Sequence, residues 1–252
     1  MGARKDHSII AFLGLTFAWT YFFHAAVIFW GLEARGVMYG VGLAGPTLVA
    51  VLLVYRSDES LEEFLRRGVQ WKVGALWYAI ALSPAIIRLA GFFVYSASKG
   101  SPALPPFRDV AIGQLVVVFF FAALCEEFGW RGYALPRLQQ RFGSAGMGLV
   151  LGTVWALWHV PHFLMPGASQ AGSAFEPFWL DLISQSFILA LLYNRTRGSI
   201  FIAVVHHGVD NVSANLIAVP EAAVGYVLGA SCVAGLATLP FLPRPLLRVR
   251  AP

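Results

Sequence analysis

The chain has 252 residues, of which 58% are hydrophobic and only 12% are charged, and its formal net charge is +5. Soluble domains usually carry about 25% charged residues, so this composition excludes an ordinary soluble protein. The positive residues flank long apolar runs, which is the pattern of a membrane protein, and we expect no nucleic-acid partner.

Apolar runs of the length needed to cross a bilayer recur along the chain. A helix needs about 20 apolar residues to cross about 30 Å of hydrocarbon. Eight runs approach this length and predict an all-α, polytopic membrane protein, a bundle of about eight transmembrane helices. The runs are Ser8 to Trp30, Val37 to Tyr55, Val73 to Ala97, a run that starts at Val110, Ala145 to Phe163, Phe178 to Tyr193, Ser199 to Val219 and Ala222 to Phe241.

The basic residues sort to one side of these predicted spans. With a cytoplasmic amino terminus, 14 of the 18 Lys and Arg residues fall in cytoplasmic segments, Arg35, Lys99 and Arg108 fall outside, and Arg88 lies within the third span. Basic residues near spans are retained on the cytoplasmic side. We therefore predict that both termini are cytoplasmic.

Three regions follow from this topology. Residues 1–109 hold the N-terminal spans and a cytoplasmic amphipathic segment, residues 110–219 hold the predicted catalytic core, and residues 220–252 hold the final span and a basic tail. In the amphipathic segment, Ser57 to Gly68, acids precede bases, which predicts a short capped helix at the cytoplasmic surface. We expect the tail, Pro243 to Pro252, to lie at anionic headgroups.

Ionisable side chains gather in the fourth, fifth and seventh spans. Each costs roughly 2.5–3.5 kcal/mol to place in a membrane, so such residues usually face a cavity or a partner. They are Glu126, Glu127, Arg131, His159, His162, His206, His207 and Asp210, joined by the amide of Asn211. The earlier spans contribute His24 and Arg88, which we interpret as packing or hydrogen-bonding residues.

The two adjacent glutamates have different predicted roles. Glu127 and Arg131 are four residues apart with the acid first, the favourable order for a helical ion pair. Glu126 points about 100° away around the helix and is left for chemistry. If the helix continues past Arg131, kinked at Gly132 and Pro136, Glu126 lies about 21 Å from its cytoplasmic end, level with His159 at about 22 Å.

Two further pairs have the spacing of one helical turn. His207 and Asn211 share one face, as do Trp155 and His159 before a bend expected at Pro161. A carboxylate can take a proton from water, a histidine can orient that water or bind a metal, and further donors can stabilise an oxyanion. This set suits peptide hydrolysis.

The motifs resemble those of the CAAX protease and bacteriocin-processing family of intramembrane proteases, which includes the type II CAAX prenyl proteases. Its EExxxR motif is met by Glu126 to Arg131 and its HxxxN motif by His207 to Asn211. Its FxxxH motif appears as Trp155 to His159, with tryptophan in place of phenylalanine. The resemblance covers Val110 to Leu216.

The resemblance implies an intramembrane endopeptidase that cuts a membrane-associated substrate, either a prenylated CAAX-like peptide or a leader peptide. A glutamate and a histidine would activate water, and a histidine and an asparagine would bind the oxyanion. These catalytic residues are Glu126, His159, His207 and Asn211, with Glu127, Arg131 and Trp155 in supporting positions.

Several alternatives stay open at this point. Zinc could be held by Glu126, His159 and His207 with a water, whereas a metal-free glutamate mechanism uses the same residues. His206 competes with His207, since it could pair with Asp210 one turn later. An ion-coupled transporter, or a non-catalytic membrane scaffold or immunity protein, would also contain buried polar residues. We expect an integral protein of a bacterial inner (plasma) membrane, with lipids and a membrane-associated peptide as partners.

Overall fold

The structure, a computed structural model, describes residues 2–30 and 35–243. Most of this part is helical, and its one strand-type pairing is an isolated antiparallel bridge between Phe107 and Ile217. The predicted all-α class is therefore confirmed. The basic tail predicted at 243–252 lies outside the described residues except for Pro243.

The elements are α1 (Gly2–Trp30), α2 (Arg35–Leu43), α3 (Gly45–Tyr55), α4 (Leu61–Arg66), η2 (Arg67–Val69), α5 (Ala75–Ala81), α6 (Ser83–Ser98), α7 (Ile112–Glu127), η3 (Phe128–Ala134), α8 (Leu135–Trp158), α9 (Val160–Leu164), α10 (Phe175–Arg195), α11 (Ile200–Leu216), α12 (Glu221–Ala237) and η4 (Leu239–Phe241).

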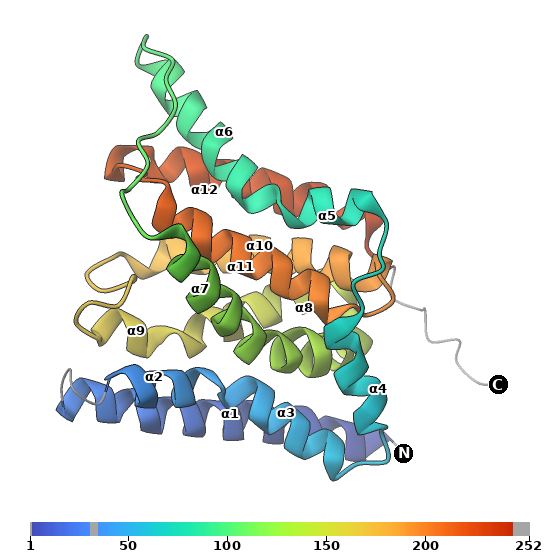
Figure 1. The fold of residues 1–252 in the computed structure, drawn as a ribbon. Coiled ribbons are helices and arrows are strands. Elements are labelled where there is room, and N and C mark those ends of the chain that lie inside the picture. The colour runs from blue at the N-terminus through green and yellow to red at the C-terminus, as the bar shows by residue number, and fades with distance from the viewer. Residues whose placement is uncertain (1, 31–34, 244–252) are drawn as a thin grey trace.

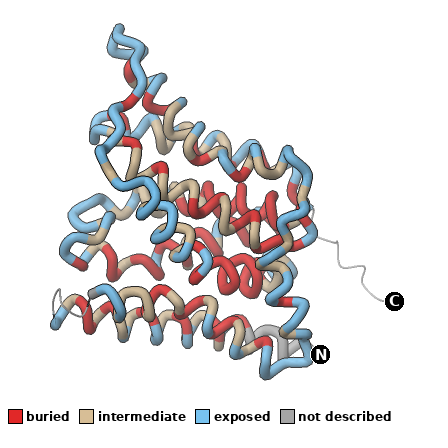
Figure 2. The backbone as a smooth tube through the Cα atoms, in the orientation of Figure 1, coloured by how far each residue is buried: buried red, intermediate tan, exposed pale blue. Residues whose placement is uncertain are grey.

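The long helices lie side by side in layers (Figure 1). Helix α1 packs along α2 and α3, α8 along α10, α7 along α11, and α6 along α12. Buried residues concentrate in the middle of the bundle, while the outer helices expose many side chains (Figure 2). Many of those exposed side chains are large and apolar, such as Phe22, Val117 and Val233, as expected of surfaces that face lipid.

Four helical stretches of the described chain are long and apolar enough to cross a membrane, or six when each of two bent pairs counts as one span. The bent pairs are α2 with α3, at 45°, and α5 with α6, at 49°. Each second helix has a proline in its first turn, Pro46 or Pro84. Proline lacks an N–H and clashes with the preceding turn, which accounts for both bends.

The fourth and fifth predicted spans form one stretch, Ile112–Leu164. Its 53 residues would measure about 80 Å if straight, far more than one crossing of about 30 Å. The break lies at Gly143, whose φ of 69° and ψ of 177° are not helical and favour glycine. The seventh predicted span corresponds to α11, which has 17 residues. The number of spans and the cytoplasmic side of the termini stay predictions.

The helix that carries the two glutamates continues beyond Arg131, as predicted. Helix α7 passes into the π-helix η3 and then into α8. Gly132 lies within the π-helix and Pro136 lies in the first turn of α8, directly after it. The predicted kink at these residues stays a prediction, whereas the backbone leaves helical geometry at Gly143. All seven residues of η3 are buried, so this segment fills the middle of the bundle.

The predicted surface helix is also present, but it begins later than expected. Ser60, rather than Ser57, is its N-cap, and its hydroxyl accepts a hydrogen bond from the Glu63 N–H at 3.2 Å. Ser57 instead donates to the Val54 carbonyl at 2.9 Å. Helix α4 lies at the same end of the bundle as the start of α1 (Figure 1).

Candidate active site

Glu127 is held by an arginine and a histidine at the junction of α7 and η3. Arg131 Nη1 donates to Glu127 Oε1 at 2.9 Å, and both side chains are fully buried. His207 Nδ1, on α11, lies 2.8 Å from the same oxygen. Because a carboxylate oxygen only accepts, His207 Nδ1 carries the hydrogen. The predicted ion pair is therefore present, and it also fixes a histidine of the HxxxN motif.

Glu126 is buried and takes its hydrogen bond from the fifth predicted span. Trp155 Nε1 donates to Glu126 Oε2 at 2.8 Å. The guanidinium of Arg131 lies over the Trp155 ring, 3.9 Å from its centre, which is a cation–π contact. Trp155 stands where the FxxxH motif has phenylalanine. Phenylalanine would supply an aromatic ring here but has no N–H to donate to Glu126.

His159 is positioned by the same tryptophan. Its Nδ1 lies 2.8 Å from the Trp155 backbone carbonyl, so Nδ1 carries the hydrogen and Nε2 has the lone pair. His159 follows the last residue of α8, and Pro161 lies in the first turn of α9. The Trp155 ring also meets the His207 ring edge-on, with centroids 5.2 Å apart. Trp155 therefore contacts Glu126, His159 and His207.

The two adjacent histidines of α11 point to different partners. His206 Nε2 lies 2.6 Å from Gln185 Oε1 on α10, whereas His207 contacts Glu127. The alternative pairing of His206 with Asp210 is wrong, because Asp210 Oδ1 instead accepts from Arg88 Nη2 at 3.1 Å. His207 is thus the histidine that joins the glutamate cluster.

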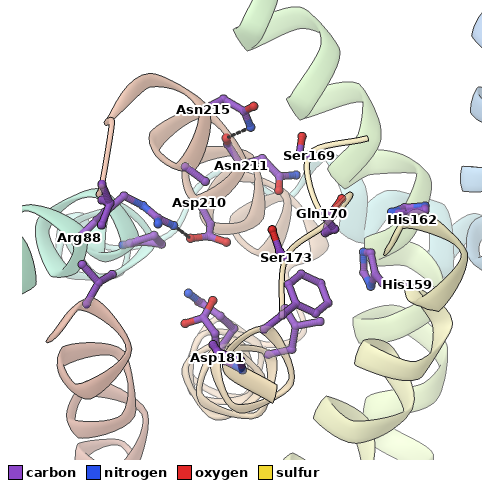
Figure 3. Close-up of a pocket in the computed structure, with 18 of the residues that line it drawn as sticks. Arg88, His159, His162, Ser169, Gln170, Ser173, Asp181, Asp210, Asn211 and Asn215 are labelled. Atoms are coloured by element: carbon purple, nitrogen blue, oxygen red, sulfur yellow. Dashed lines mark hydrogen bonds and ion pairs between the residues drawn. The ribbon is translucent and has the colours of Figure 1, made fainter. Parts of the chain in front are cut away.

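The predicted catalytic residues line one cavity of about 1030 Å³. Asn211 is half-buried and lies one turn beyond His207 on the same helix. Figure 3 shows Asn211 on the cavity wall, with His159 on the opposite side. The members of the predicted site that line the cavity are Glu126, Trp155, His159, His207 and Asn211, whereas Glu127 and Arg131 lie behind the wall.

A second polar group on the cavity wall was not predicted as part of the site. Arg88 from α6 pairs with Asp210 (Figure 3), and its Nε lies 3.4 Å from Ser213 Oγ. Asp181 lines the same wall and accepts from Ser231. The signal available in the sequence was a lone arginine inside an apolar span, which needs a buried acid as partner.

The predicted zinc ligands do not form a compact donor set. Among the described residues, no three His, Cys, Asp or Glu side chains are grouped so that they could hold a metal ion. Glu126, His159 and His207 each make one hydrogen bond to a protein group, as described above. Zinc binding stays a prediction, and we derive the chemistry below from the chain's own groups.

Fold and cavity together define a polytopic helical membrane protein with a glutamate–histidine cluster in mid-bundle. Residues 108–213 match the model of the type II CAAX prenyl endopeptidase Rce1-like family. The chain is also 24% identical over 200 residues to CAAX prenyl protease 2 of Methanococcus maripaludis, covering 71% of this chain and 72% of that protein. These similarities support an intramembrane protease.

Proposed function

We propose that this protein is an intramembrane endopeptidase that hydrolyses a peptide bond of a membrane-associated substrate. We expect it to have no nucleic-acid partner. The observation that carries the proposal is the contact set around Trp155, which brings Glu126, His159 and His207 to one cavity. The match of this same segment to a protease family supports it. We place the protein in a bacterial inner membrane, surrounded by lipid.

In the proposed reaction, Glu126 is the general base. One of its oxygens is held by Trp155, so the other is assigned to a water in the cavity. The His159 Nε2 lone pair accepts a hydrogen bond from the same water and orients it. Glu126 takes the water proton, the oxygen attacks the substrate carbonyl carbon, and Glu126 then returns the proton to the leaving amine as the C–N bond breaks.

The negative charge that develops on the carbonyl oxygen needs donors on the opposite side. His207 donates from Nδ1 to Glu127, and when it is protonated it donates from Nε2 as well. The Asn211 amide, one turn along α11, is the second donor. Donors that are fixed before the reaction and shielded from bulk water stabilise an oxyanion strongly, because they need no reorganisation.

The test uses purified protein in proteoliposomes and measures cleavage by the rise in fluorescence of lipid-anchored peptides that carry a fluorophore and a quencher. One peptide is prenylated and CAAX-like, and the other is of leader-peptide type. Glu126→Gln should lower kcat by about 10²- to 10⁴-fold, the usual contribution of a general base. Asn211→Ala should lower it by about 10²- to 10³-fold. Glu176→Gln is the matched control, since Glu176 is exposed at the start of α10 and lies outside the cavity.

The same samples separate the alternative functions. A transporter would give ion-dependent uptake without hydrolysis, and a scaffold would keep its biological effect in a folded Glu126→Gln variant. Cleavage that is equally fast in Glu126→Gln and wild type would refute the proposed mechanism. Zinc content of the purified protein, measured beside the activity of His159→Ala and His207→Ala, tests whether a metal takes part.

A further inference from the structure

The cavity opens at one end of the bundle and does not reach the other end. Its lining ends at Gln185 on α10, ten residues after the helix begins at Phe175, and at Ser231 on α12, ten residues after Glu221. On α11 it ends at His207, nine residues before Leu216. On α7 it reaches Glu126, fourteen residues after the helix begins at Ile112. At 1.5 Å per residue, the floor therefore lies about 14–21 Å from this end, against a hydrocarbon core of about 30 Å.

The open end of the cavity is formed by loops, and we call it the mouth. Its lining includes Arg108, residues 169–170 and 172–174 between α9 and α10, and Ile217 between α11 and α12. Two of these loops are tied together, because the Arg108 N–H donates to the Leu216 carbonyl at 2.8 Å. Beyond the floor, the buried segment η3 fills the bundle, and none of its residues lines the cavity.

The end opposite the mouth carries most of the described basic residues. The segments that carry them are tied to one another: Gln70 Nε2 donates to the Thr196 carbonyl at 2.9 Å, and Ser199 Oγ donates to the Gln70 carbonyl at 2.8 Å. Among described side chains, the mouth end has only Lys99 and Arg108. The opposite end has Arg56, Arg66, Arg67, Lys72, Arg137, Arg141, Arg195 and Arg197.

We infer that the mouth faces the extracytoplasmic side of the membrane, because basic loops are retained in the cytoplasm. Resting on the proposed protease function, this inference defines the substrate as a peptide segment exposed on the extracytoplasmic surface next to its membrane anchor. An extended chain advances about 3.3 Å per residue. The segment therefore needs about four to six residues to span the roughly 14–21 Å from the mouth to the level of the floor.

Thiol labelling tests the orientation without any need for catalysis. In a Cys125→Ala, Cys232→Ala background, Ser169→Cys reports on the mouth and Glu62→Cys on the opposite end, where both wild-type residues are exposed. A membrane-impermeant maleimide should label Ser169→Cys in intact cells and Glu62→Cys only after permeabilisation. Ser173→Cys, also exposed at the mouth, should repeat the Ser169→Cys result. Labelling in the reverse pattern overturns the inference.

Sided cleavage tests the substrate class. A lipid-anchored quenched peptide added to right-side-out vesicles should be cut, and the cleavage should be lost in Glu126→Gln. Inverted vesicles should cut it only after detergent opens them. Cleavage by intact inverted vesicles alone overturns the inference. If no vesicle cleaves the peptide even in detergent, the protease function fails, and the labelling alone decides the orientation.

Discussion

The hydrogen bond between Trp155 and Glu126 gives the sharpest prediction for the site. Trp155→Phe keeps an aromatic ring beneath the Arg131 guanidinium but removes the N–H that lies 2.8 Å from Glu126 Oε2. A hydrogen bond to a charged group contributes about 1.5–3 kcal/mol, and about 1.36 kcal/mol changes a rate tenfold. Because the lost bond orients the proposed general base, we expect kcat to fall about 10- to 160-fold with little change in KM.

The measurement is steady-state cleavage of the lipid-anchored peptide in proteoliposomes, with thermal unfolding recorded on the same samples. Trp130→Phe is the matched control: Trp130 is also fully buried, but its Nε1 has no hydrogen-bond partner in the described structure. We expect the control to keep kcat within about twofold, since no hydrogen bond to a charged group is lost. Equal losses of kcat in the two variants, or a Trp155→Phe variant as active as wild type, would refute the positioning role.

Three further predictions concern stability and metal. Arg131→Met should lower the free energy of unfolding by about 3–5 kcal/mol, because Glu127 is left buried without its arginine partner. The double variant Arg131→Met, Glu127→Leu should recover part of that loss in thermal unfolding. Gly152→Ala should lower the melting temperature whereas Gly225→Ala should not, since a Cβ at Gly152 would lie 2.5 Å from the Ile183 Cα and one at Gly225 would meet nothing within 4 Å. The metal-free form of the proposed reaction, in which Glu126 and His159 alone activate the water, predicts that activity survives dialysis against a chelator; loss that zinc restores would contradict that form and support the zinc alternative.

The fold was predictable in class and less so in detail. Long apolar runs identify membrane helices because the bilayer requires every backbone group to be satisfied within a helix. Run length alone does not locate the breaks. Pro46 and Pro84 were visible signals for the two bent pairs, whereas the π-helix after Glu127 has no simple sequence signature. The break at Gly143 had no predicted counterpart, since a glycine alone does not mark where a helix breaks.

The site was predictable where helical spacing decides the geometry. The four-residue spacing of Glu127 and Arg131 led directly to the observed ion pair. Contacts between helices were harder, because the sequence gives no rotation of one helix against another. For this reason the sequence left Asp210 as a possible partner of His206. In the structure Asp210 pairs instead with Arg88, which comes from α6, a helix far away in the sequence.

The adjacent glutamates make sense as parts of one charge-balanced cluster. The proposed mechanism requires both glutamates to be ionised and His207 to be protonated. In that state Arg131 and His207 balance the two negative charges, so the buried cluster has no net charge. In the proposed reaction, Glu126 takes a proton from water, and the negative charge passes to the attacking oxygen and then to the substrate oxyanion. The total stays at zero throughout, and the charge moves only from one side of the cavity to the side of His207 and Asn211. A site buried this deeply can therefore carry out the reaction without exposing a net charge to the surrounding lipid.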